Sequence, residues 1–132
     1  MAIKRVFDNH DHMPHCLTNT DRVLQIMQEY FQIHDPIDIL PHFHDKFKKE
    51  FIAGLCEKLA LLATSENNEC AKMCFTAAGY QLARHVIAIE GSMSDEIKVQ
   101  AGGPKIIIIG SVWKSWPLLK DSFIQSKRQF IK

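Results

Sequence analysis

Apolar residues recur at every third or fourth position along most of this 132-residue chain, which is the period of an amphipathic α-helix. The pattern is clearest in residues 21–34, where the apolar side chains on one face are Val23, Ile26, Met27, Tyr30, Phe31 and Ile33. Pro36 follows closely, and the residue before a proline avoids helical geometry. The pattern therefore predicts a helix that ends near His34.

Three further helices are predicted, at about residues 46–63, at about residues 69–90 and from about Ser115 onward. The first has an apolar stripe of Ile52, Leu55, Leu59 and Leu62, and the second has an apolar face of Ala71, Phe75, Ala78, Leu82, Val86 and Ile89. Gly91 is suited to end the helix predicted at residues 69–90. Pro117 fits only the first turn of the helix predicted from about Ser115. A short helical turn is predicted at residues 37–40.

Residues 105–110 depart from the helical period. The four consecutive isoleucines of Ile106–Ile109 are the strongest β-strand signal in the chain. A strand that is apolar on both faces needs a neighbour on each edge, since each buried backbone group left unpaired costs about 1–3 kcal/mol. The sequence therefore predicts a mainly helical segment with one core strand, belonging to an α/β fold whose other strands lie outside this chain.

Composition and charge limit the classes of partner. The 16 Lys and Arg residues nearly balance the 15 Asp and Glu residues, so a net charge of +1 favours neither nucleic acid nor an anionic membrane. The first residues, MAIKRVF, contain no apolar signal segment. The four cysteines include no CxxC pair, and we interpret them as reduced thiols, with Cys56 and Cys74 acting as small apolar residues of helices. These features favour a cytoplasmic protein.

Histidine-rich segments supply candidate metal ligands, which are His10, Asp11, His12, His15, Cys16, His42 and His44. Their spacing matches neither an HxxxH pair on a helix nor a CxxC knuckle. Polar loops with exposed histidines are therefore the favoured interpretation, and no metal site is assigned. The neighbouring Cys16 and His15 could formally act as nucleophile and base, but adjacent side chains seldom face one another and no third group is evident.

The sequence IIIIGSVWKS places a glycine and a serine between the predicted strand and the predicted last helix. Backbone N–H groups at such a turn can receive a phosphate group. Gly110 would let a ligand approach the backbone, and Ser111 and Ser115 can offer hydroxyl groups. Neither GxxxxGK[ST] nor GxGxxG is present, so an ordinary strand-to-helix turn capped by serine remains the alternative.

The heptapeptide GSVWKSW at Gly110–Trp116, followed by LLKDSF, closely resembles the corresponding stretch of animal N-acetylglucosamine kinases. These enzymes belong to the superfamily of sugar kinases, Hsp70 and actin. The resemblance is continuous from RVFD through QEYFQI, HFHDKFKKEFIAGLCEKLA and AGYQLARHVIA to Phe123. Pro117 is a departure, because the resembled proteins commonly carry an acidic residue there.

The resemblance implies an enzyme that uses ATP and Mg²⁺ to phosphorylate the 6-hydroxyl group of N-acetylglucosamine between two lobes. The chain is similar to part of the C-terminal lobe on the nucleotide side, so residues 1–132 are expected to form one partial domain. The expected nucleotide contacts are Ala53, Gly54, Gly110, Ser111 and Ser115. Ala53 and Gly54 are included because small side chains would leave room for ATP or ADP.

The resemblance also implies an absence. The phosphate loop, the catalytic aspartate and the residues that grip N-acetylglucosamine precede anything matched in this chain, so no catalytic residue is assigned. We expect the isolated chain to be inactive as a kinase. The alternative hypothesis is a helical interaction module without enzymatic activity, which pairs through the exposed strand at residues 105–110, for instance as a homodimer.

Overall fold

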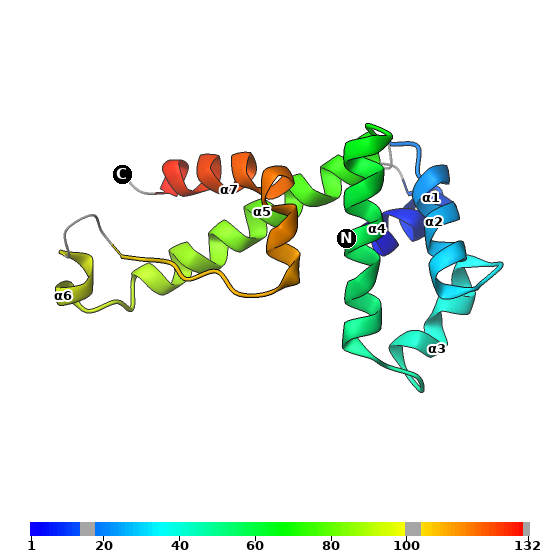
Figure 1. Ribbon diagram of the computed structural model, residues 1–132, viewed down its shortest axis with the longest axis horizontal. Coiled ribbons are helices and arrows are strands. Elements are labelled where there is room, and N and C mark those ends of the chain that lie inside the picture. Colours follow the sequence, from blue (N-terminus) through cyan, green and yellow to red (C-terminus); the bar gives the residue numbers. More distant parts are fainter. Residues whose placement is uncertain (14–17, 100–103, 131–132) are drawn as a thin grey trace. The chain divides into compact units, whose positions relative to one another are not determined.

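The computed structural model describes residues 1–13, 18–99 and 104–130, with side chains as far as residue 126, and every regular element within these ranges is helical (Figure 1). The elements are α1 (Ala2–His10), α2 (Asp21–Phe31), η1 (Pro36–Ile39), α3 (Leu40–Phe43), α4 (Lys49–Ser65), α5 (Glu69–Glu90), α6 (Asp95–Lys98), η2 (Ser111–Ser115) and α7 (Trp116–Phe130). They form two compact units, Met1–Cys74 and Phe75–Lys132. In the described part of the chain, no helix combines the length and apolarity needed to cross a membrane.

The predicted core strand at residues 105–110 is wrong, and with it the prediction of an α/β segment. Residues 104–109 have no regular structure, and no backbone hydrogen bond joins them to another described residue. Ile107 and Ile109 are each 84% exposed, and Ile106 and Ile108 are each 45% exposed. A strand exists only through its hydrogen bonds to a neighbour, and the described residues supply no second extended segment to pair with this one.

The core of the first unit is formed by one apolar face from each of α1, α2 and α4, together with the first turns of α5. Its buried side chains include Val6, Val23, Met27, Phe31, Leu55, Leu59, Leu62 and Ala71. Met27 and Val23 are fully buried, as the three- and four-residue spacing predicts. Burying one such side chain contributes about 1.5–3 kcal/mol, so this shared core positions α2 against α4.

Helix α2 ends three residues earlier than the sequence predicts. Gln32 adopts the left-handed conformation, with φ of 54°, and closes the helix in the manner usual for a C-terminal cap. The chain then begins η1, where the Asp35 side chain accepts a hydrogen bond from the N–H of Ile37 at 2.9 Å. The Asp38 carboxylate accepts one from the N–H of Asp35 at 3.0 Å, which completes a capping box around Pro36.

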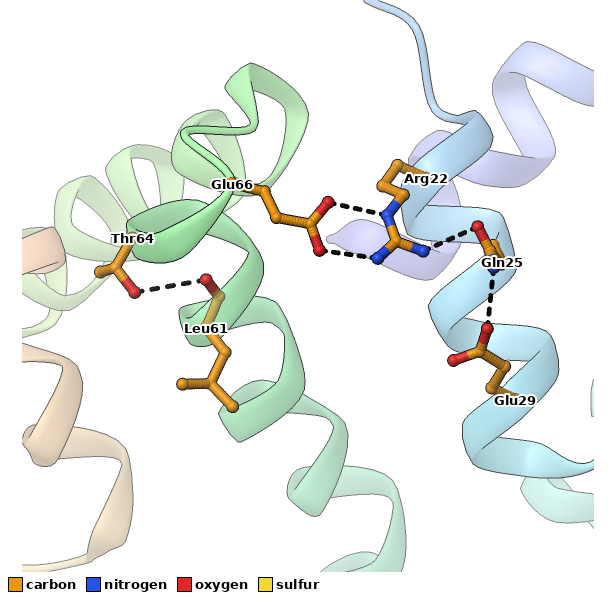
Figure 2. A network of polar contacts seen from close by, with 6 residues as sticks. All are labelled: Arg22, Gln25, Glu29, Leu61, Thr64 and Glu66. Atoms are coloured by element: carbon orange, nitrogen blue, oxygen red, sulfur yellow. Dashed lines mark hydrogen bonds and ion pairs between the residues drawn. The ribbon is translucent and has the colours of Figure 1, made fainter.

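An ion pair joins the start of α2 to the end of α4 (Figure 2). Arg22 donates from Nε and Nη2 to the two carboxylate oxygens of Glu66, at 2.8 and 2.6 Å. The same guanidinium donates to Gln25 at 2.7 Å, and Gln25 donates to Glu29 at 2.9 Å. This two-point contact fixes the orientation of the two helices more than it adds to stability, since both charged groups are exposed to solvent.

In the second unit, α7 packs against α5 at Gly79. A Cβ atom added to Gly79 would lie 3.3 Å from the carbonyl carbon of Leu119 and closer still to the Leu119 oxygen and Ser122 Oγ. Leu119 and Ala83 are buried at this contact between the helices. Glycine at this position therefore lets the two helix backbones approach closely. This close approach explains why a glycine is present inside a helix, where it normally reduces stability.

Most of the predicted helices are confirmed, with shifted ends. Helix α5 has the predicted bounds, and α4 covers residues 49–65 rather than 46–63. Helix α7 begins at Trp116 with Pro117 as its second residue, as the proline predicts. The short turn predicted at 37–40 corresponds to η1 and α3, whereas α1 and α6 were not predicted because neither carries a long apolar stripe.

Candidate functional site

The turn from Gly110 to Ser115 is the clearest candidate for ligand contact in the second unit. Gly110 has φ of 117° and ψ of 161°, a conformation that residues with a side chain rarely adopt. Apart from Gly110 and its two chain neighbours, no atom of the described residues lies within 4 Å of the place where a Cβ would stand, so the space beside this backbone is open. Ser111 is exposed and Ser115 is half-buried, so a ligand can reach the backbone and the Ser111 hydroxyl.

Aromatic side chains hold this turn against α7. The ring centroids of Trp113 and Trp116 are 5.7 Å apart, and those of Trp116 and Phe123 are 5.5 Å apart in an edge-to-face arrangement. The N–H of Trp113 also donates to the Gly110 carbonyl at 3.4 Å. Lys114 remains exposed and can add a positive charge beside the turn. The turn is thus anchored at one end while its glycine and first serine face solvent.

The other two predicted contacts, Ala53 and Gly54, lie on α4 in the first unit. The Ala53 side chain is exposed, so the structure leaves it free for contact. The space beside Gly54 is occupied, because a Cβ there would overlap the hydroxyl of Tyr30 and lie 3.3 Å from Cζ of that ring. Tyr30 donates from this hydroxyl to the carbonyl of Phe51 at 2.7 Å. Close packing between α2 and α4 therefore accounts for the glycine without a ligand.

Tyr30 belongs to a cluster of aromatic rings at the start of α4. Its ring stacks on that of Phe51 with centroids 5.0 Å apart, and Phe31 meets both rings edge-on. His42 lies 5.1 Å from Phe31 and 5.6 Å from Phe51 by ring centroids. The cluster supports the segment that carries Ala53 and leaves Phe51 partly exposed.

The predicted site residues fall into two groups. Gly110, Ser111 and Ser115 are brought together by η2, and Ala53 and Gly54 are neighbours on α4. The two groups belong to different units of the chain. A comparison with models of known protein families found no match to this sequence.

The candidate metal ligands do not form a site within the described residues. His10 and Asp11 are exposed neighbours whose Nδ1 and Oδ1 atoms lie 3.1 Å apart. No group of three or more His, Cys, Asp or Glu side chains able to hold a metal ion is found in residues 1–13, 18–99 and 104–130. His15 and Cys16 lie outside the described residues.

A second group of reactive side chains was missed at the sequence level. Cys70 and Cys74 are both buried at the start of α5, and the side chains of Cys70 and Arg5 form hydrogen bonds with Cys74. These contacts lower the pKa of Cys74 to about 7, with the Cys70 hydrogen bond as the largest cause, whereas burial raises the pKa of Cys56. The four-residue spacing places the two cysteines on one helix face, but the sequence could not show that Arg5 lies beside them.

Proposed function

We propose that this chain is the nucleotide-side portion of an ATP-dependent N-acetylglucosamine kinase and that the turn Gly110–Ser115 contacts the nucleotide. The observation that carries the proposal is the backbone of Gly110, which is held in a conformation reserved for glycine beside open space. Glycine is used where the backbone takes a left-handed or strained conformation and where a ligand approaches it closely, and Gly110 combines such a conformation with open space. The resemblance of GSVWKSW to the same stretch of these kinases supports this assignment.

The turn would bind the nucleotide rather than carry out phosphoryl transfer. The Ser111 hydroxyl and exposed backbone N–H groups are suited to hydrogen bonds with the ribose or phosphate oxygens of ATP, and Lys114 adds positive charge. Phosphoryl transfer to the sugar 6-hydroxyl requires a base and charge stabilisation that we assign to other parts of the kinase. Among the described residues, no cluster of three or more carboxylate, histidine or cysteine side chains is placed to hold Mg²⁺.

The test is a titration of the ¹⁵N-labelled chain with ADP, followed by the NMR signals of backbone amides. We expect weak, saturable shifts at Gly110, Ser111 and Ser115. Gly110→Ala should abolish them, because alanine cannot hold a φ of 117° without strain. Gly91→Ala is the matched control, since Gly91 has no atom within 4 Å of an added Cβ and no left-handed φ.

A coupled assay with ATP and N-acetylglucosamine should show no turnover by this chain alone. Turnover comparable to that of a complete sugar kinase would overturn the assignment of catalysis to other parts of the enzyme. Saturable ADP shifts that spare Gly110–Ser115 would overturn the assignment of the turn as the nucleotide contact.

A second candidate function, strand-mediated association, is favoured by the exposed isoleucines. Residues 104–109 offer backbone donors and acceptors that no other described residue uses, flanked by four apolar side chains. Such a segment can add to the edge of a β-sheet in another molecule or pair with a second copy of itself. Both hypotheses, part of a kinase and an interaction module, are compatible with this exposed segment. Only the interaction module should form a discrete oligomer.

Size-exclusion chromatography with light scattering distinguishes the two candidates. A uniform dimer that Ile107→Lys converts to a monomer would favour the module. Val99→Lys is the matched control, because Val99 is 79% exposed and lies outside the segment. A monomer, or a polydisperse aggregate, would count against the module.

A further inference from the structure

Two buried thiols and a guanidinium meet where α1 approaches the start of α5. Cys70 is 1% exposed and Cys74 is 6% exposed, and their spacing of four residues places both on one face of the helix. Cys74 receives side-chain hydrogen bonds from Cys70 and from Arg5 of α1. A buried cysteine in a purely apolar core has no such donors, so these contacts distinguish Cys74 from a cysteine that only fills space.

The surroundings of Cys74 stabilise its thiolate. The hydrogen bond from Cys70 is the main cause that lowers its pKa to about 7, and the charges of Arg5 and the Met1 amine add smaller contributions against the opposing effect of burial. The pKa of Cys56 is instead raised by burial alone. Near neutral pH, Cys74 therefore carries the thiolate, the form that attacks electrophiles, more often than an ordinary cysteine does.

We propose that Cys70 and Cys74 form an oxidant-sensitive thiol pair that reacts with hydrogen peroxide and closes a disulfide within α5. In the first step the Cys74 thiolate attacks one peroxide oxygen, the O–O bond breaks, and hydroxide leaves. The sulfur is oxidised to a sulfenic acid and the peroxide is reduced. In the second step the Cys70 sulfur attacks the Cys74 sulfur, the S–O bond breaks, and water leaves with the Cys70 proton.

Helix geometry permits this bond with a small local adjustment. Residues four apart on an α-helix have Cα atoms about 6 Å apart, within the range of about 4.4–6.8 Å found for disulfides. Their Cβ atoms are about 5–6 Å apart, whereas a disulfide needs about 3.5–4.5 Å, so one helical turn must tighten by about 1–2 Å. Cys70 is the second residue of α5, where the helix has fewest internal hydrogen bonds to lose.

The burial of both sulfurs limits the class of oxidant. A bulky disulfide such as oxidised glutathione would have to displace neighbouring helices, whereas peroxide is little larger than water. The site is therefore assigned to small peroxides rather than to thiol–disulfide exchange with a large partner.

Tryptic mapping tests the proposal directly because Lys72 separates the two cysteines. Oxidation of the folded chain should join the peptides of residues 59–72 and 73–84, each of which contains one cysteine. The peptide of residues 50–58 carries Cys56 and should stay reduced under the same dose of peroxide. In Cys70→Ser the linked pair should disappear, and dimedone should trap the sulfenic acid on Cys74.

The pH profile separates a reactive pair from two packing residues. The rate of linkage should rise through a midpoint near pH 7, which is the lowered pKa of Cys74. Arg5→Gln should slow linkage several-fold at neutral pH, and Arg5→Lys should restore most of the rate. Oxidation of Cys56 as fast as Cys74, or a midpoint above pH 8.5, the usual value of a free thiol, would overturn the proposal. So would failure to recover the linked peptides from folded protein.

Discussion

Replacing Gly79 with alanine sets two physical effects of opposite sign against each other. Gly79 lies inside α5, where alanine is favoured over glycine by about 1 kcal/mol. The added Cβ would overlap the carbonyl oxygen of Leu119 and Ser122 Oγ on α7. The serine can rotate away, but the carbonyl oxygen belongs to the α7 backbone, so the helix itself must shift.

The packing effect should exceed the propensity effect. Overpacking of a close contact costs about 1–3 kcal/mol, and a clash with backbone lies toward the upper part of that range. After subtraction of the gain of about 1 kcal/mol in helix propensity, we expect a net loss of about 1–2 kcal/mol. With a typical slope for urea unfolding, this loss lowers the midpoint by about 0.5–1 M.

Urea unfolding followed by far-UV circular dichroism measures the change. Ala88→Gly calibrates helix propensity, because Ala88 is exposed on the same helix and should lose about 1 kcal/mol without any clash. Gly79→Ala combined with Ser122→Ala should recover part of the loss by removing one of the two overlaps. A rise in the urea midpoint of Gly79→Ala would refute the reasoning, since it would mean that propensity alone decides the outcome.

Three further predictions concern the first unit. Gly54→Ala should change the free energy of unfolding by less than about 1 kcal/mol, because the gain in helix propensity offsets the hydrogen bond lost when the Tyr30 hydroxyl is displaced. Urea unfolding of Gly54→Ala, compared with that of Tyr30→Phe, tests this balance. The hydrogen bond from Arg22 lowers the pKa of Glu66 below its usual value of 4.5. The stabilisation that this ion pair gives the folded chain is therefore present above pH 4.5 and is lost as the pH falls through the lowered pKa. In Arg22→Met, the pKa of the Glu66 carboxyl group, measured by NMR titration, should return toward 4.5. Asp35→Ala should cost about 1 kcal/mol in urea unfolding because η1 loses its capping box, and an unchanged midpoint would contradict that role.

The helices could be predicted from the sequence because their information is local. The apolar stripe of α4, the face of α5 and the position of Pro117 in α7 each follow from residues within a few turns of one another. The end of α2 was placed too late because Gln32, a residue with a side chain, takes a left-handed conformation that residue type alone does not indicate. The cap at Asp35 then begins the next element.

The strand and part of the candidate site could not be predicted in the same way. A run of four isoleucines indicates that the segment favours an extended backbone. Whether it forms a β-strand depends on a second strand to pair with, which the segment itself does not contain. At Gly54 the structure shows a close approach by Tyr30, which lies 24 positions earlier in the sequence and could not be identified from residues near Gly54, while the nucleotide contact stays a prediction. The contact of Arg5 with Cys74 is longer in range still and left no local signal.

The exposed isoleucines of residues 104–109 also bear on the lifetime of the chain in a cell. Short segments rich in β-branched residues, with little charge, are prone to β-aggregation when they are exposed. Aggregation and pairing with a partner sheet would compete for the same six residues. Aggregation through these residues would remove folded protein irreversibly, so the lifetime of the chain would be set by a rate as well as by its equilibrium stability.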